Sequence, residues 1–100
     1  MKTKTPLPRL EASSAHVDAF RALAHLTRLQ VFFFLVRAGR EVPAGEIQEA
    51  MEVPGPTLSH HLDRLRRAGL VRSRREERYV YYAANPETAI ALVRLLTACC

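Results

Sequence analysis

The stretch of sequence that decides the fold is PGPTLSHHLDRLRRAGLVRSRREERYVYY, residues 54–82. At 100° per residue, Leu62 and Leu65 project within about 40° of Leu58 and form one apolar stripe on a short helix. Pro56 suits the first turn of this helix, because the N–H that proline lacks would have no partner there. Gly69 is a typical stop signal at the other end. The stretch therefore predicts a helix that buries its leucine stripe.

The opposite face of this helix is polar and basic. It carries His60, Asp63, Arg64 and Arg67, with Thr57 and Ser59 on the flanks near the helix start. After the helix, residues 70–75 and 78–82 are separated by two glutamates and predict two strands of a hairpin with a charged tip. A helix followed directly by a basic hairpin is the outline of a winged helix-turn-helix.

The positive charge of the chain is concentrated in this region. Between residues 60 and 78 there are seven arginines and three acids, a local net charge of +4, while the whole chain has a formal net charge of +5. A focused basic patch favours a phosphate-bearing partner, and clustered arginine favours nucleic acid over a membrane surface.

The length of 100 residues and the apolar content of 48% predict one domain, which we place at residues 13–100. Residues 1–12 hold two lysines and two prolines without periodicity, and we expect a disordered arm. The chain has no run of about 18 apolar residues and no apolar core for a signal peptide near Met1. We therefore expect no contact with a membrane and a cytoplasmic location.

Four further helices are predicted around the central stretch. The first begins at Ser13 or Ser14, the second covers residues 27–36 and is apolar nearly all round, and the third runs from Ala44 to about Met51 after Val42-Pro43. The last begins near Pro86. The expected fold is mainly α with a small hairpin, in the order α-α-α-α-β-β-α. The last helix is too apolar for a lone domain to cover, which predicts a homodimer formed through the terminal helices.

Three segments resemble the ArsR/SmtB family of bacterial winged-helix repressors: ALAHLTRLQV (22–31), LSHHLDRLRRAGLV (58–71) and RREERYVYY (74–82). The resemblance spans roughly residues 15–100. It implies a homodimer that binds a twofold operator in double-stranded DNA and leaves it when a metal or metalloid binds. The known effector sites of that family differ between members, so the resemblance alone does not select the effector.

Three of the family's site patterns are absent from this sequence. The Cys-Val-Cys element of many arsenic sensors is replaced by Val42-Pro43-Ala44-Gly45. The last helix has no histidine for a zinc or nickel site, and the second helix has no cysteine for a persulfide or oxidant sensor. The adjacent Cys99 and Cys100 resemble a further layout among arsenic sensors, in which neighbouring cysteines end the last helix.

Trivalent arsenic and antimony are thiophilic, so the resemblance implies that As(III) or Sb(III) binds at Cys99 and Cys100. A third ligand comes either from chain beyond residue 100 or from another kind of group. No obligatory cofactor is expected. Two alternatives remain open: the same repressor responding to another soft metal or to thiol oxidation, and a winged-helix interaction module without an effector.

The expected DNA contacts divide into two kinds. Side chains near the helix start are candidates for reading base edges: Thr57, Ser59, His60 and next Arg64. Other arginines are candidates for phosphate contacts: Arg67, Arg74, Arg75 and Arg78. His61 lies close to the leucine stripe and is expected to pack or hydrogen-bond. An enzyme is not expected, because no carboxylate is placed to orient the Ser59-His60 pair.

Overall fold

The computed structural model describes residues 12–98, and all structural statements refer to this part of the chain. Its elements are α1 (Ser14–Leu23), α2 (Leu26–Ala38), β1 (Val42–Pro43), α3 (Ala44–Met51), α4 (Gly55–Arg67), β2 (Val71–Glu76), β3 (Tyr79–Ala84) and α5 (Pro86–Thr97). The winged helix-turn-helix prediction is confirmed. Cys99, Cys100 and most of the predicted N-terminal arm lie outside the described residues.

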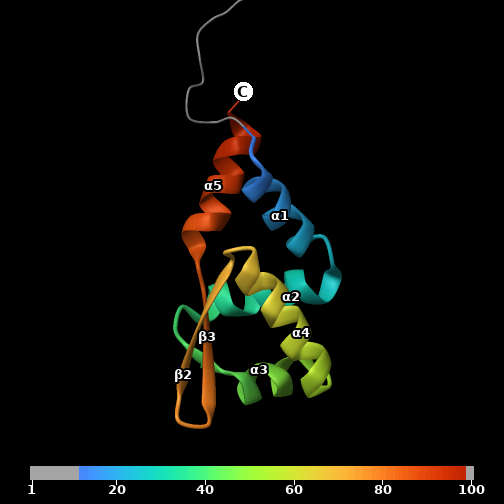
Figure 1. Cartoon of the computed structure of the whole chain (residues 1–100), viewed down its shortest axis with the longest axis vertical. Helices are drawn as coiled ribbons and strands as arrows, with labels where there is room; N and C mark the ends of the chain where they lie inside the picture. Colours follow the sequence, from blue (N-terminus) through green and yellow to red (C-terminus); the bar gives the residue numbers. More distant parts are fainter. Residues whose placement is uncertain (1–11, 99–100) are drawn as a thin grey trace, which may run out of the picture.

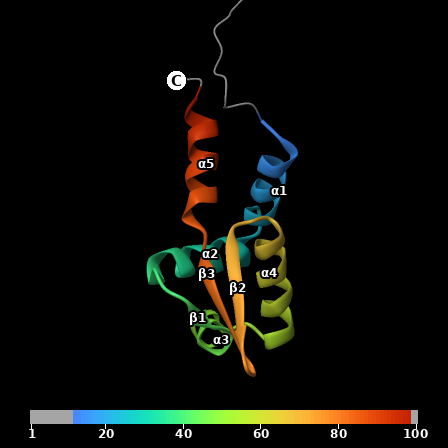
Figure 2. The ribbon, with the colours of Figure 1, turned by 60° about the vertical axis from the view of Figure 1, so that its left-hand side comes forward.

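The molecule has two ends, as Figures 1 and 2 show. Helices α1 and α5 lie together at one end, while α3, α4 and the β2–β3 hairpin form the other end. Helix α2 lies between them and packs against α1, α4 and β3. No single described helix is long and apolar enough to cross a membrane; α1 and α2 pass that test only as a pair bent by 98°.

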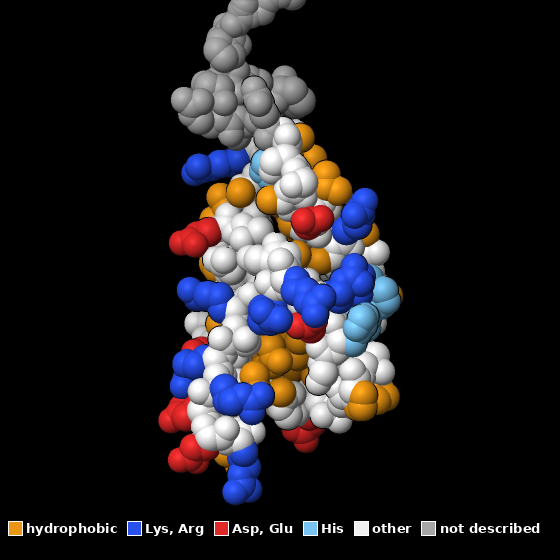
Figure 3. Space-filling view, viewed as in Figure 1, with side chains coloured by type: hydrophobic (Ala, Val, Ile, Leu, Met, Phe, Trp, Pro, Cys, Tyr) orange, Lys and Arg blue, Asp and Glu red, His pale blue; other side chains and the backbone are white. Residues whose placement is uncertain are grey.

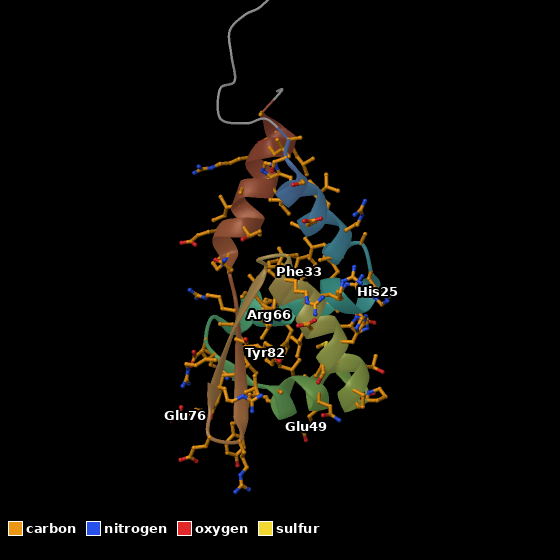
Figure 4. All side chains as sticks on the ribbon, in the orientation of Figure 1. His25, Phe33, Glu49, Arg66, Glu76 and Tyr82 are labelled. Atoms are coloured by element: carbon orange, nitrogen blue, oxygen red, sulfur yellow. The ribbon has the colours of Figure 1, made fainter. Side chains whose placement is uncertain are left out.

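The sheet has three antiparallel strands in the order β1-β3-β2. In one row across it, Val42 pairs with Tyr82, and Tyr82 pairs with Ser73. Val42 is fully buried and Tyr82 packs against the core, so this row faces the helices (Figure 4). The predicted third helix is confirmed: α3 covers Ala44–Met51, and Pro43 is its N-cap. The sequence did not show that Val42-Pro43 also form a short strand, β1.

Local signals fix the ends of the helices. Ser13 caps α1, and His16 completes a capping box by accepting from the Ser13 backbone N–H at 2.9 Å. The His25 Nδ1 atom accepts from the Thr27 N–H at the start of α2. Gly39 ends α2 with φ of +63°, a left-handed conformation that glycine adopts without strain.

Helix α4 ends in a Schellman motif at the predicted stop. Gly69 has φ of +78°, its N–H donates to the carbonyl of Arg66, and the Leu70 N–H donates to that of Leu65. The Gly69 carbonyl also accepts from Thr88 Oγ1 at 2.7 Å. This bond joins the end of α4 to the first turn of α5.

One core supports these elements, and its largest fully buried side chains come from α2, β1, α3, α4 and the residue before β2: Val31, Leu35, Val42, Ile47, Leu62, Leu65 and Leu70. A helix that is apolar nearly all round is expected at the buried centre of a domain, but α2 is buried on one side only. Val31, Phe32 and Leu35 are buried, but Phe33 is 54% exposed. A domain this small covers one side of α2 and leaves the other side to solvent.

Candidate nucleic-acid interface

Helix α4 has the two faces that the sequence predicts. Leu58, Leu62 and Leu65 are at most 2% exposed and fix the helix to the core. The opposite side is open to solvent and carries the predicted DNA-binding residues of this helix: Thr57, Ser59, His60, Arg64 and Arg67. In Figure 3, arginine side chains gather across the middle of the molecule, with histidines at one edge. The leucine stripe therefore leaves the basic face free for a ligand.

Asp63 organises the arginines on this face. Its Oδ1 accepts from Arg66 Nη2 at 2.7 Å, and its Oδ2 accepts from Arg67 Nε at 2.9 Å. The Arg66 hydrogen bond, followed by the charge of Arg67, holds the pKa of the Asp63 carboxyl below its usual range. One ionised carboxylate thus orients two guanidinium groups and leaves the face with net positive charge.

A second group of arginines forms where α1 meets α4. A shallow pocket of about 170 Å³ is lined by Asp18, Arg21, Arg64, Arg67 and Ala68. Arg21 was not among the predicted site residues, because an arginine on an amphipathic helix looks like any other solvated side chain. Its place beside Arg64 and Arg67 emerges only when α1 packs on α4.

Beneath the basic face, a buried polar link joins three helices. The Arg28 Nε atom donates to the carbonyl of Ala22 at 2.7 Å, and its Nη1 lies 3.3 Å from His61 Nδ1. Arg28 is 8% exposed and His61 is 7% exposed. Burial, followed by the charge of Arg64, lowers the pKa of Arg28. The structural role expected for His61 is confirmed, whereas Arg28 was missed.

The β2–β3 hairpin (residues 71–84), called the wing from here on, presents its arginines in two different ways. Arg75 and Arg78 are exposed and take part in no ion pair within residues 12–98. Arg74 instead donates from Nε and Nη2 to the carboxylate of Glu41, at 2.9 and 2.8 Å, and from Nη1 to Glu76 at 2.8 Å. These hydrogen bonds raise the pKa of Arg74, and the bond from Arg74 lowers the pKa of Glu41.

The structure places no metal centre within residues 12–98. No three His, Cys, Asp or Glu side chains in that part are arranged to hold an ion. His25, His60 and His61 do lie near one another, with ring centroids 4.7 Å apart for His25 and His61 and 5.9 Å apart for His60 and His61. The predicted metalloid ligands Cys99 and Cys100 are outside the described residues.

The helix-turn-helix domain family matches residues 23–74. KmtR, an HTH-type transcriptional regulator of Mycobacterium tuberculosis, is 42% identical over 77% of this chain and 58% of its own length. The arsenic resistance transcriptional regulator ArsR1 of Pseudomonas putida is 38% identical over 68% of this chain and 52% of its own length. The chain therefore spans just over half the length of these two relatives.

Two solved structures resemble the fold closely. HlyU from Vibrio cholerae has a TM-score of 0.68 at 33% identity, covering 85% of this chain and 94% of its own. The homodimeric winged helix-turn-helix DNA-binding domain of Mb0332 from Mycobacterium bovis, a possible ArsR-family regulator, has a TM-score of 0.70 at 26% identity, covering 86% and 79%. The matched domain, the similar relatives and the fold all agree. The chain belongs to the ArsR family of winged helix-turn-helix transcriptional regulators.

Proposed function

We propose that this chain is a homodimeric repressor that binds a twofold operator in double-stranded DNA. The observation that carries the proposal is the exposed face of α4, which combines small polar side chains at the helix start with arginines farther along. A helix of this kind fits the major groove, where its first turns reach base edges. The β2–β3 hairpin lies beside it and supplies further positive charge.

Within this proposal the side chains have separate tasks. Thr57, Ser59 and His60, with Arg64 next to them, read base edges, because they lie on the open face in the first turns of α4. Arg67, Arg75 and Arg78 bind phosphates, and these charge contacts make the affinity for DNA depend on salt concentration. The function requires access to chromosomal DNA, which is consistent with a cytoplasmic location.

The dimer is proposed through α5 and α1. Helix α5 buries Leu92, whereas Ile90, Val93 and Leu96 are half or more exposed. Val17 on α1 is also exposed, and a groove of about 330 Å³ lies between the two helices. Covering these side chains against a second copy removes apolar surface from water. The similarity to the homodimeric Mb0332 domain supports a homodimer.

The proposed effector is As(III) or Sb(III), bound by the thiolates of Cys99 and Cys100. Thiolate ligands select soft ions, and the similarity to ArsR1 supports arsenic. Because only Ala98 separates Cys99 from the end of α5 in the sequence, a metalloid bound there acts on the proposed dimer helix. Coupling requires that the DNA-bound and free forms differ in metalloid affinity.

The test is fluorescence anisotropy on the DNA upstream of the gene, titrated with arsenite under reducing conditions. We expect specific binding, and release by arsenite from the wild type but not from a Cys99→Ser/Cys100→Ser variant. If both proteins bind the DNA specifically and arsenite releases neither, the repressor proposal stands and the metalloid effector is rejected. Cadmium and a thiol oxidant are then the next effectors to titrate. Weak binding to every DNA sequence would instead support the interaction module.

A further inference from the structure

The wing packs against α2, α3 and α4, and its backbone pairs with the rest of the domain through one short strand. Strand β1 has two residues, and one of them is Pro43, which has no N–H to donate. It pairs with the part of β3 at Tyr81 and Tyr82. Beyond this point the hairpin continues from Arg75 and Val80 to its turn without a third strand. Backbone pairing alone therefore leaves the outer half of the wing weakly restrained.

Arg74 bridges the sheet at the place where this support ends. It pairs with Tyr81 across β2 and β3, and Tyr81 pairs with Pro43 of β1. The Arg74 guanidinium lies 4.9 Å from the centre of the Tyr81 ring and reaches Glu41, which directly precedes β1. The side chain thus crosses the central strand from one edge of the sheet to the other. A surface ion pair restrains structure best when the arginine binds the carboxylate through a bidentate pair of hydrogen bonds, as Arg74 binds Glu41.

Arg74 also lies on the face of the sheet that is turned away from the helices. Side chains alternate between faces along a strand, and the row containing Val42, Tyr82 and Ser73 faces the core. The neighbouring row, with Arg74 and Tyr81, faces outward. Arg75 belongs to the same face as Ser73, which is the face on the side of α4. The alternation therefore directs Arg75, and not Arg74, toward the side of α4.

The charge of Arg74 is already balanced. Glu41 and Glu76 both accept hydrogen bonds from it, so this group of three side chains has a net charge of −1. A phosphate would have to displace two carboxylates before it could use the guanidinium. Arg75 and Arg78 face no such competition within residues 12–98.

We infer that Arg74 is a positioning residue, which with Glu41 ties the wing to the connection between α2 and β1 and so sets where Arg75 and Arg78 meet DNA. This inference rests on the proposed function and replaces the sequence-based assignment of Arg74 to phosphate. In this inference Glu41 contributes to DNA binding although it is an acid, because it holds Arg74.

The decisive variant is Glu41→Gln, because the two roles of Arg74 predict opposite signs. If Arg74 positions the wing, Glu41→Gln weakens operator binding about threefold or more, even though it removes a negative charge near DNA. If Arg74 binds phosphate, the same change frees Arg74 and tightens binding. It also raises by about one the salt slope, which is the decrease in log affinity per unit increase in log salt concentration. Glu77→Gln is the matched control: it removes the same charge from the turn of the same hairpin, where Glu77 forms no ion pair within residues 12–98, and should tighten binding about twofold.

Arg74→Lys gives a second comparison. Lysine keeps a positive charge for phosphate but loses the planar fork that binds Glu41 and Glu76 together. The inference predicts that Arg74→Lys loses as much affinity as Arg74→Ala, with an unchanged salt slope in both. A lysine variant close to wild type, together with a slope lowered by about one in Arg74→Ala, would overturn it.

Amide hydrogen exchange of the free protein separates this inference from the proposed function. We expect Glu41→Gln to speed exchange in residues 71–84 at least severalfold and Glu77→Gln to leave it unchanged. Unchanged exchange in both variants would reject the tie, whatever the DNA result. If the wild type binds no DNA, the proposed function fails, and exchange still decides whether Glu41 and Arg74 hold the wing.

Discussion

Arg28 on α2 and His61 on α4 meet in the protein interior, with 3.3 Å between Nη1 and Nδ1. Arginine has no acceptor, so Nδ1 of His61 must be unprotonated and accept the hydrogen bond. Arg28 also binds the carbonyl of Ala22 at the end of α1. The pair therefore connects the proposed dimer end of the molecule with the helix proposed to read DNA.

The first prediction concerns the pH dependence of stability. Burial, and then the charges of His25, Arg28 and His60, lower the pKa of His61 in the folded chain, while the unfolded value is near 6.5. Below that pH the unfolded chain binds a proton that the folded chain does not. The stability that neutral His61 contributes is therefore fully present above pH 6.5 and is lost as pH falls toward the folded pKa. The free energy of unfolding decreases over this range by at most about 1.4 kcal/mol per pH unit.

The measurement is urea unfolding at a series of pH values from 7.5 to 5.5. His61→Asn should be less stable than the wild type at pH 7.5 but should lose less stability on acidification. Ser59→Asn changes an exposed neighbour on the same helix without removing any of the charges that act on His61, and it should keep the wild-type slope. Equal slopes in the wild type and His61→Asn would contradict the prediction.

The second prediction is that Arg28→Ala destabilises the fold by about 2–4 kcal/mol, because it leaves the Ala22 carbonyl and His61 Nδ1 buried without a donor. Urea unfolding at neutral pH measures the loss. Arg37→Ala, at an exposed position of the same helix, should stay within about 0.5 kcal/mol of the wild type. A small loss for Arg28→Ala would mean that water replaces the missing donor.

The sequence predicted the recognition element well because its signals are local. The spacing of Leu58, Leu62 and Leu65 and the stop at Gly69 lie within one helix, so periodicity and end signals were sufficient. Strand β1 was missed for the opposite reason. Two residues carry no periodic pattern, and Val42-Pro43 becomes a strand only because β3 returns from far along the chain to pair with it.

Polar and charged residues likewise divide into those whose place follows from local sequence and those whose role depends on distant partners. Ser59 and His60 could be assigned to the open face from the helix alone, whereas the roles of Arg28 and Arg74 depend on partners 33 residues away in sequence. An arginine in isolation looks like a solvated cation, and nothing near it in sequence shows that its charge is already used. Tertiary packing decides which arginines remain available to DNA.

The third prediction separates base reading from phosphate binding. Ser59→Ala should reduce affinity for the operator by about 1–3 kcal/mol and relax preference at one base pair, with an unchanged salt slope. Arg75→Ala should weaken binding to all sequences alike and lower the salt slope by about one. Anisotropy on operator and scrambled DNA at several salt concentrations measures both effects. A lowered slope for Ser59→Ala would move that residue to the phosphate group.

The last prediction concerns the apolar face of α5. Val93 is 58% exposed and Leu96 is 62% exposed, so replacing either by glutamate costs the lone subunit little. If a second copy covers them, Val93→Glu and Leu96→Glu each place a charge in an apolar interface and should shift the protein from dimer to monomer.

Sedimentation equilibrium measures the oligomeric state, and circular dichroism establishes that the helices remain. Tyr79→Glu is the control, because Tyr79 is also an exposed apolar side chain but lies on the wing, at the opposite end of the molecule from α5. It should remain dimeric. Since a twofold operator needs two recognition helices, the monomeric variants should also lose most operator affinity while keeping a folded α4. A dimer that survives both α5 substitutions would place the subunit contact on another face.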